Sequence, residues 1–428
     1  MELVLSKEKK LSTIILEKNL ALLTDHFYQG CKENCVQELG LEIEHFVVKK
    51  DSKKTVSYYE EHGIAQILLD LSAAFSKKEM TASRDLIGMS NKDYNITIEP
   101  AGQLEISIAP RSDIAQIRHI YHKFLKLLAP VLEKHGCELV TLGYHPVTKA
   151  GSLPLIPKKR YEYMDNYFKN TGKYGMNMMR GTASTQISID YCSEEDFVLK
   201  YRVAYILMPA LKLLCDNTPV FEGRPQKHLL KRTDIWNNVD PDRTGIIPGL
   251  FEDDFGFESY SQYLWNLPLI FVMRDGAPVY TERKTTGELY SNKILTVEEI
   301  NHILSMTFLD VRLKNYIEMR AADAMPFEYV MAYMALIKGI FFHQEVLQTI
   351  ACMFPVSVKD ILHAQKELRE KGYQADIYGE EACEFLGQIL EFASEKLDMG
   401  EKAYLLPFKE LVDRKKTLTE EYYEEYNK

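Results

Sequence analysis

The chain has 428 residues, of which 46% are hydrophobic, so it can bury a sizeable core. Its formal net charge of -10 at pH 7 argues against a protein that coats nucleic acid, because no excess of basic side chains offsets the carboxylates. We therefore expect a globular protein without a nucleic-acid partner, and we expect residues 1–428 to form one domain.

Seven scattered cysteines favour reduced thiols over a disulfide framework. Residues 1–4 lead into the charged run 7–10, which reverses the order found in a signal peptide. The longest apolar run, residues 203–211, is too short to cross a bilayer. These features predict a cytoplasmic location and no membrane partner, and they leave the oligomeric state open.

Residues 11–40 have helical periodicity, and an apolar stripe on them is expected in the core: Leu16, Leu20, Leu23 and Phe27. Residues 40–48 then alternate with a period of two, which predicts a strand. Its aliphatic side chains face one side, and Glu42 and Glu44 face the other. With a rise of roughly 3.3 Å per residue, these two carboxylates lie about 7 Å apart along the strand.

A second acidic segment follows at residues 96–105, which read as two strands joined by a Pro/Gly turn. This hairpin places Glu99 and Glu105 close together near its turn. Helical periodicity marks three segments around it: residues 64–75, 114–135 and 194–216.

Polar side chains also stand out in the middle of the chain. Residues 153–161 are basic, rich in proline and too irregular for an ordinary element, so they predict a binding loop that carries Arg160. Residues 186–190 alternate isoleucines with oxygen-bearing side chains, the first of which is Gln186. This pattern predicts another strand with one polar face.

A turn-rich stretch at residues 217–245 concentrates arginines, among them Arg232 and Arg243. Guanidinium groups suit carboxylate or phosphate oxygens through paired hydrogen bonds. The next predicted strand places Glu318 and Arg320 on one face.

The last part of the chain, from about residue 325 to 428, is predicted to be mainly helical. Residues 327–354 are largely apolar, and Ser357 with Asp360 three positions later has the capping-box pattern of a helix start. The acidic residues 419–426 predict a tail or a last helix.

Several carboxylate-bearing strands in one sheet would repel one another unless cations neutralise them. Magnesium prefers oxygen ligands and keeps positions open for water and phosphate. The alternative is that each strand faces water separately. The sequence has no P-loop, no Gly-x-Gly-x-x-Gly, no His-Glu-x-x-His and no Gly-x-Ser-x-Gly motif, so a bound nucleotide would depend on metals and arginines.

An ordered set of motifs between about residue 20 and residue 360 resembles the plant-type and related bacterial glutamate-cysteine ligases. The motifs are Gly-Leu-Glu42-x-Glu44, Glu99-Pro-x-Gly-Gln-Leu-Glu105, Pro-Lys-x-Arg160-Tyr, Phe-Glu222-Gly-x-Pro, Asp-x-Asp242-Arg243-Thr-Gly and Tyr-Ile-Glu318-Met-Arg320-x-x-Asp323. The resemblance implies an α+β fold similar to glutamine synthetase, with a curved, mostly antiparallel sheet, helices on its convex side and the active site in its concave funnel.

The resemblance also implies a reaction and its cofactors. ATP would phosphorylate the side chain of L-glutamate, and the amine of L-cysteine would displace the phosphate to give gamma-glutamylcysteine, the first step toward glutathione. Two or more magnesium ions would be held by five carboxylates, whose replacement by glutamine should impair turnover more than folding: Glu42, Glu44, Glu99, Glu105 and Glu318.

By the same carry-over, Arg320 and Glu318 are the expected catalytic residues, with Arg320 placed to contact phosphate oxygens. The expected substrate-binding residues are Arg160, Arg232, Arg243 and Gln186, although Asp240 and Asp242 could pair with Arg243 for purely structural reasons. At Ser188 the chain departs from the asparagine usual in the family.

Three rival functions remain open at this point. A ligase of the same fold could join glutamate to a different amine, since the ATP and metal groups would be unchanged. A non-catalytic paralogue could keep the fold without turnover. A glycoside hydrolase also needs two carboxylates, but it has no use for five together with a set of arginines.

Overall fold

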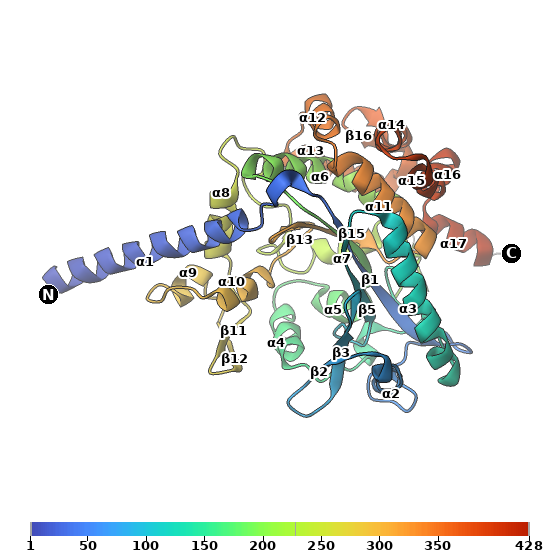
Figure 1. Cartoon of the computed structure of the whole chain (residues 1–428), viewed down its shortest axis with the longest axis horizontal. Helices are drawn as coiled ribbons and strands as arrows, with labels where there is room; N and C mark the ends of the chain where they lie inside the picture. Colours follow the sequence, from blue (N-terminus) through green and yellow to red (C-terminus); the bar gives the residue numbers. More distant parts are fainter. Residues whose placement is uncertain (1, 227, 427–428) are drawn as a thin grey trace.

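The computed structural model describes residues 2–226 and 228–426. At its centre lies a nine-stranded sheet whose neighbouring strands are antiparallel (Figure 1). In chain order the strands are β1 (Leu39–Lys49), β2 (Lys77–Met80), β3 (Leu86–Ser90), β4 (Tyr94–Ile98), β5 (Leu104–Arg111), β6 (Cys137–Val140), β7 (Ser184–Ile189), β14 (Val311–Leu313) and β15 (Ile317–Asp323).

Strand β1 lies in the middle of this sheet. The strand order is β14-β15-β7-β1-β5-β4-β3-β2, and β6 pairs with the second half of β1. Glu42 lies opposite Ser107 of β5 on one side and opposite Gln186 of β7 on the other. Glu44 lies opposite Glu105. The strands predicted to carry the acidic residues are therefore neighbours in one sheet.

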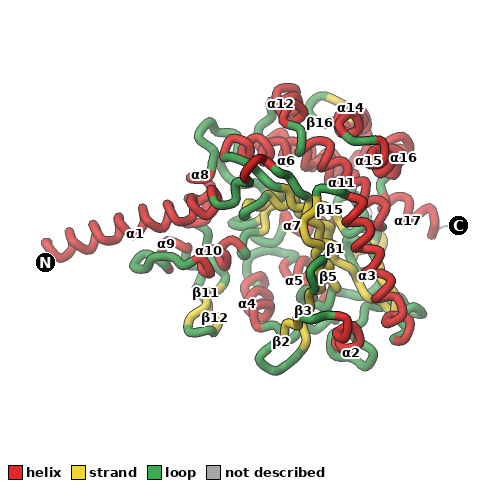
Figure 2. The backbone as a smooth tube through the Cα atoms, viewed as in Figure 1, coloured by secondary structure: helices red, strands yellow, loops and turns green. Residues whose placement is uncertain are grey.

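The aliphatic residues of these strands face the core, as their alternation predicts. Leu41 is 1% exposed, and Ile43, Ile106 and Ile187 are fully buried. Three long helices pack against the strands: α3 (Ile114–Lys134), α6 (Glu194–Leu214) and α11 (Phe327–Phe341). Figure 2 shows the yellow strands at the centre with red helices around them. The mixed architecture with a large antiparallel sheet agrees with the predicted α+β class.

Three shorter helices provide residues that face the polar side of the sheet: α4 (Lys159–Phe168), α5 (Gly175–Gly181) and α7 (Lys231–Asn237). The prediction of an irregular loop over residues 153–161 is wrong at its end, because α4 begins at Lys159. Arg160 consequently lies in the first turn of a helix. Helix α7 likewise interrupts the predicted turn-rich stretch, and it carries Arg232.

Helix α1 (Glu2–Tyr28) extends away from the rest of the molecule (Figure 1). Of the predicted core stripe, Leu23 and Phe27 are fully buried, and Phe27 packs against α8 (Phe257–Asn266). Leu16 and Leu20 are only partly buried, so the prediction is wrong for the first half of the stripe. The helix also ends at Tyr28 rather than near residue 40, because the next ten residues form turns that lead into β1.

The remaining short elements connect these layers. They are α2 (Ile64–Leu71), α9 (Thr286–Leu289), α10 (Val297–Leu304), β8 (Val220–Phe221), β9 (Arg224–Pro225), β10 (Thr244–Gly245), β11 (Phe271–Arg274), β12 (Ala277–Tyr280) and β13 (Phe308–Leu309). Parallel pairing of β10 with β13 fixes the loop that precedes β14 against the segment that follows α7.

After α11 the chain is helical apart from the two-residue strands β16 (Asp376–Ile377) and β17 (Glu380–Glu381). The helices are α12 (Gln344–Met353), α13 (Val358–Lys371), α14 (Ala382–Lys396), α15 (Met399–Lys402), α16 (Leu406–Arg414) and α17 (Leu418–Tyr426). Ser357 and Asp360 form the predicted capping box at the start of α13. Within residues 2–226 and 228–426, no single helix has the length and hydropathy of a membrane span; α11 and α12 reach them only as a pair bent by 87°.

Strand β15 contains a β-bulge. Met319 pairs with Ile187 of β7 and Ala322 pairs with Thr185, so Arg320 and Ala321 together face the single residue Gln186. Bulges of this kind redirect backbone groups and side chains, and they are common beside active sites. Here the bulge lies next to the arginine that the sequence analysis singled out.

Candidate active site

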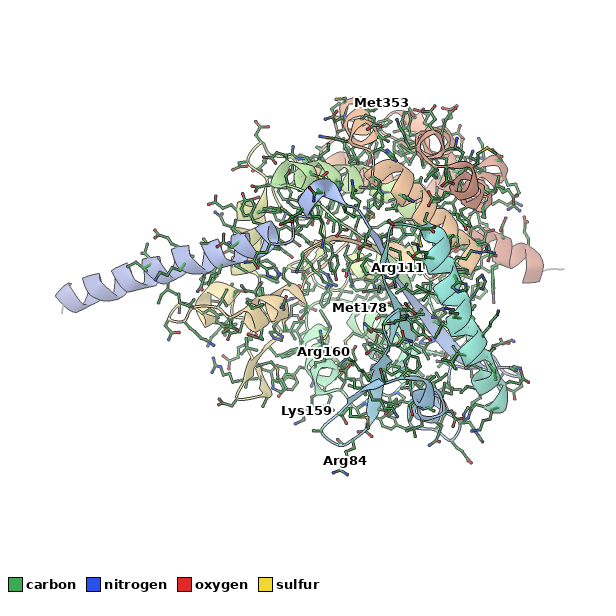
Figure 3. All side chains as sticks on the ribbon, in the orientation of Figure 1. Arg84, Arg111, Lys159, Arg160, Met178 and Met353 are labelled. Carbon is green, nitrogen blue, oxygen red and sulfur yellow. The ribbon has the colours of Figure 1, made fainter. Side chains whose placement is uncertain are left out.

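A cavity of about 310 Å³ lies between the polar side of the sheet and the three short helices. The sheet contributes Glu42, Glu44 and Glu105 to its lining, and Glu99 comes from the turn after β4. Helices α4, α5 and α7 contribute Arg160, Tyr161, Met164, Met178, Met179, Arg232 and Trp236. Figure 3 labels Arg160 of α4 and Met178 of α5, two of these lining residues.

The four acidic residues of this lining strongly perturb one another. Burial and the charges of Glu105 and Glu318 raise the pKa of Glu42 to about 8. Burial and the charge of Glu44 raise the pKa of Glu99 to about 7, although Lys158 and Arg160 oppose the shift. Burial, Glu99 and Glu44 raise the pKa of Glu105 to about 8. We call Glu42, Glu44, Glu99 and Glu105 the acidic wall.

Glu44 is held by donors from the neighbouring strand. The backbone N–H of Ser184 donates to its Oε2 at 2.7 Å, and Nε2 of Gln186 donates to its Oε1 at 3.2 Å. Burial raises the pKa of Glu44, while the charge of Arg232 and the hydrogen bond from Ser184 act in the opposite direction. Gln186 in turn accepts a hydrogen bond from Nη1 of Arg320 at 2.5 Å. Gln186 therefore links the acidic wall to Arg320.

Glu318 is placed differently from the acidic wall. It is fully buried, and its carboxylate is bonded to Arg312 at 2.7 Å, to Arg320 at 2.8 Å and to Lys314 at 2.9 Å. Burial raises the pKa of Glu318, but the charges of Arg312, Arg320 and Lys314 outweigh burial and hold the pKa well below its usual range. The structure thus places the expected metal ligand at the centre of a cationic cluster, with Arg312 and Arg320 lining the cavity.

Besides Arg312 and Arg320, the basic lining of the cavity contains Lys158, Arg160 and Arg232. The guanidinium of Arg232 is anchored by the bulge, because it donates to the carbonyl oxygens of Arg320 and Ala321 at 3.2 to 3.4 Å. Three buried N–H groups of the cavity lining have no hydrogen-bond partner among the described residues: Nε of Arg160, Nε of Arg232 and Nε1 of Trp236. Buried donors without acceptors are costly, so these groups indicate a ligand that accepts hydrogen bonds.

Arg243 does not line the cavity, and the expectation that it binds substrate is corrected here. It is fully buried and donates to Oδ2 of Asp240 at 2.6 Å and to the hydroxyl of Tyr167 at 2.7 Å. It also donates to the carbonyls of Met306 at 3.0 Å and Pro268 at 2.7 Å. These bonds join α4, the loop after α8 and the segment before β13, so Arg243 has a structural role.

A divalent cation fits the donor chemistry of the acidic wall. Carboxylate oxygens are the ligands that magnesium prefers, and a cation would relieve the repulsion that raises these pKa values. Among residues 2–226 and 228–426, however, no three carboxylate, imidazole or thiol groups form a ready-made metal site. The side chains of the acidic wall would therefore have to adjust to hold an ion.

A second cavity of about 290 Å³ continues along the sheet from the first, and Glu42 lines both. Its lining has fewer charged side chains than the first and includes two lysines, three carboxylates, two asparagines and two tyrosines: Lys32, Lys92, Glu38, Glu42, Asp190, Asn91, Asn95, Tyr94 and Tyr316. Ser188, the departure from the family pattern, also lies here. Glu42 consequently lies where the two cavities meet.

Three further residues of the site were not predicted from the sequence: Arg312, Lys314 and Trp236. Arg312 lies opposite Glu318 in the β14–β15 hairpin. It stands between two buried aliphatic residues, and this alternation in the sequence could have predicted a strand with Arg312 on its polar face. Trp236 follows Arg232 by four residues on α7, which places both on one helix face. That signal was hidden because the segment was not expected to be helical.

The antiparallel sheet and its polar cavity define a protein of the glutamine synthetase-like fold. The glutamate-cysteine ligase of Francisella tularensis, solved in complex with AMP, superposes with a TM-score of 0.52 at 9% identity, covering 88% of this chain and 82% of that one. The model of glutamate-cysteine ligase family 2 matches residues 38–413, and the chain belongs to this family.

Relatives in plants support the same family. The chain is 31% identical over 335 residues to the chloroplastic glutamate-cysteine ligase of Brassica juncea, covering 77% of this chain and 65% of that protein. It is 31% identical over 338 residues to chloroplastic glutamate-cysteine ligase B of Oryza sativa subsp. japonica, covering 77% and 68%. The chain thus spans about two thirds of the length of these relatives.

Proposed function

We propose that the protein is an ADP-forming ligase that joins the side-chain carboxylate of L-glutamate to the amine of L-cysteine. The observation that carries this proposal is the opposition of two charged surfaces across one cavity. Arg160 and Arg232 present buried N–H donors without acceptors, and they face an acidic wall whose carboxylates repel one another. Family membership supports the reaction, because the named relatives are glutamate-cysteine ligases.

In this proposal Arg160 and Arg232 bind carboxylate groups of glutamate. Arginine forms paired, charge-assisted hydrogen bonds to carboxylates, and the bulge carbonyls already fix the plane of the Arg232 guanidinium. The reacting carboxylate of glutamate would then lie near Glu42, where the two cavities meet.

The second cavity is the proposed place for ATP. Lys92 suits phosphate oxygens, whereas Lys32 is paired with Asp190 at 3.4 Å. The tyrosines and asparagines offer surfaces and hydrogen bonds for a nucleoside. Because Glu42 lines both cavities, the terminal phosphate of ATP would lie next to the amino acid. Phosphoryl transfer depends mainly on alignment and charge neutralisation, and this continuity of the two cavities would serve the alignment.

Two or more magnesium ions, held by the acidic wall, would neutralise the ATP phosphates when bound. Arg312 and Arg320 line the cavity and are oriented by Glu318, so they are placed to stabilise negative charge that develops on the transferred phosphoryl group. Glu318 then acts through the two arginines rather than as a metal ligand. The seven free thiols support our proposal of a reducing, cytoplasmic location.

The test uses purified protein with ATP, magnesium and glutamate, and it measures phosphate release with each amino acid in turn as the acceptor. We expect release to require glutamate and to be stimulated most by cysteine, with gamma-glutamylcysteine as the product by mass spectrometry. Stimulation by another amine alone would retain the ligase class and reject cysteine. ATP consumption that does not depend on glutamate would reject the proposal.

A further inference from the structure

Helix α17 is the last helix before the C terminus, and it lies beyond residues 38–413, which the family model matches (Figure 1). Its residue Thr419 is only 2% exposed. The backbone N–H of Thr419 donates to the carbonyl oxygen of Asp216 at 3.1 Å. The Thr419 hydroxyl accepts from the backbone N–H of Thr218 at 2.9 Å and donates to the Asp216 carbonyl at 3.3 Å. Thr419 therefore fixes the backbone of residues 216–218, which we call the linking segment.

The linking segment holds the start of α7. Oδ1 of Asp216 accepts a hydrogen bond from the backbone N–H of Leu230 at 3.0 Å. Leu230 directly precedes α7 and has a left-handed backbone, with φ 56° and ψ 40°. A leucine in this conformation is strained and keeps it only where neighbouring groups hold it. Asp216 consequently helps to determine where α7 begins, and α7 carries Arg232.

The linking segment also holds the end of β15. Oδ2 of Asp323, the last residue of this strand, accepts from the backbone N–H of Asn217 at 2.9 Å and from Oγ1 of Thr218 at 2.6 Å. All three residues are buried. Earlier in the same strand, the carbonyl oxygens of the bulge accept hydrogen bonds from the guanidinium of Arg232.

Arg232 is thus supported at both of its ends. Its backbone is placed by the start of α7, and its guanidinium is placed by β15; both elements are bonded to the linking segment. We propose that Thr419 is a positioning residue for the glutamate substrate, because it fixes the segment on which both supports of Arg232 depend. This inference rests on the proposed ligase function and deepens it. Thr419 lines neither cavity, so it acts through Arg232 and touches no substrate.

The charges in this region act in the same direction as the hydrogen bonds. Burial lowers the pKa of Arg232, and the charge of Asp323 opposes this shift. Burial raises the pKa of Asp323, and Arg232 opposes that shift in turn. Each group therefore favours the charged form of the other. Displacement of β15 from the linking segment would weaken this attraction together with the bonds to the bulge.

A second contact of α17 reaches the loop between the linking segment and α7. The hydroxyl of Tyr423 accepts from the backbone N–H of Gln226 at 2.7 Å and donates to the carbonyl oxygen of Pro219. The N–H of Gln226 also donates to the same carbonyl at 2.8 Å, which closes the loop. Tyr423 is only partly buried, so Tyr423→Phe removes the hydroxyl without disturbing the core and gives an independent variant.

The experiment compares variants that differ by one hydroxyl. Thr419→Val removes it, and Thr419→Ser keeps it. Thr281→Val is the matched control, because Thr281 is also 2% exposed, donates to the carbonyl of Leu269 and lines neither cavity. Phosphate release with cysteine as the acceptor gives kcat and the KM values for glutamate and ATP. Calorimetry gives the melting temperature of each protein.

We expect Thr419→Val to raise the KM for glutamate by about three- to tenfold, because a buried hydrogen bond is lost and the N–H of Thr218 is left without its acceptor. Its kcat and its KM for ATP should change less than about twofold. Thr419→Ser should restore the glutamate KM to within about twofold of the original, and Tyr423→Phe should raise it by about two- to threefold. Thr281→Val should lower the melting temperature and leave the glutamate KM unchanged.

The outcomes separate this inference from the proposed function. If the unmodified protein releases no phosphate with glutamate, the ligase function fails, and the inference fails with it. If the unmodified protein is active and Thr419→Val lowers the melting temperature but keeps the glutamate KM, the ligase function stands and Thr419 has only a structural role. An equal rise in the KM for ATP would also overturn the proposal. Should Thr419→Val fail to fold, Tyr423→Phe decides, and an unchanged glutamate KM in that variant overturns the proposal.

Discussion

Glu44 and Glu105 lie directly opposite each other in the ladder between β1 and β5, with the carboxylates of both in the same cavity. Like charges in facing positions destabilise a sheet. Burial, the charge of Glu99 and this repulsion raise the pKa of Glu105 to about 8. A pair that weakens the isolated fold in this way is best explained by a cation that the working protein binds there.

Replacing Glu105 with glutamine should separate stability from activity. In metal-free protein at pH 8 we expect Glu105→Gln to raise the melting temperature by about 2 °C, because it removes one of the repelling charges. Turnover should fall by about a hundredfold or more, because a cation ligand is lost. Calorimetry and phosphate release measure the two effects.

Glu391→Gln on the exposed face of α14 is the matched control, and it should alter neither quantity. A Glu105→Gln protein that is less stable than the original without metal, yet retains its turnover, would contradict the assignment of this residue to the acidic wall.

Magnesium affinity should depend on pH in a defined direction. The pKa values of Glu42, Glu99 and Glu105 lie at about 8, 7 and 8, so protons occupy these carboxylates below pH 7 and compete with the cation. The magnesium concentration for half-maximal phosphate release should therefore rise about tenfold or more between pH 8.5 and pH 6.5.

The same pKa shifts predict the stability of the metal-free protein. Because the folded pKa of Glu105 is above the ordinary value of 4.5, folding favours the protonated form. The contribution of this group to stability is then lost as pH rises from about 4.5 through about 8. Thermal scans across this pH range, with and without magnesium, test the stability prediction. For the preceding prediction, a magnesium requirement that is independent of pH would argue against these carboxylates as ligands.

Arg232→Lys should weaken glutamate binding. Lysine cannot form the paired bonds of a guanidinium, nor can it bridge the carbonyls of the bulge in the same way. We expect the KM for glutamate to rise roughly 10- to 150-fold with a smaller change in kcat. Arg118→Lys, exposed on α3, is the control. An unchanged KM for glutamate would remove Arg232 from the substrate site.

Arg243→Lys, in contrast to Arg232→Lys, should lower the stability of the protein and leave glutamate binding nearly unchanged. Its four hydrogen bonds hold three segments together in a fully buried position, so we expect the free energy of unfolding to fall by about 3 kcal/mol. The KM for glutamate in the protein that remains folded should change less than twofold. Denaturant titration and kinetics of the same preparation distinguish this from a substrate contact.

Glu318→Gln should impair both folding and turnover. The change leaves Arg312, Lys314 and Arg320 crowded without their shared counter-charge, and removing one partner of a buried ion pair costs about 3 to 5 kcal/mol. This differs from the expectation that every glutamine replacement would spare folding. A Glu318→Gln protein with normal stability would show that the three cations do not depend on this carboxylate.

The sequence predicts the acidic strands well because their evidence is local. In β1 the aliphatic residues alternate with Glu42 and Glu44. Because the aliphatic face is buried in the core, the two glutamates must lie on the opposite face of the strand. The hairpin between β4 and β5 is equally local, since a Pro/Gly turn brings Glu99 and Glu105 together within seven residues.

The sequence predicts the arginines less well because their roles depend on distant partners. Arg243 and Arg232 lie in neighbouring turn-rich segments, yet one is closed off by Tyr167 and Pro268 and the other opens onto the cavity. No pattern within a few residues separates these cases. Trp236 was missed for a related reason, because α7 is only seven residues long and has no clear apolar period.

The extra residue in β15 makes the position of the substrate-binding residue Arg232 depend on the number of residues in the strand. Because Arg320 and Ala321 share one partner on β7, their carbonyls turn toward Arg232 instead of completing the ladder. Deletion of Ala321 would remove the bulge and release the guanidinium of Arg232 while leaving every charged group in the protein. The register of β15, and not only the identity of its residues, therefore positions Arg232.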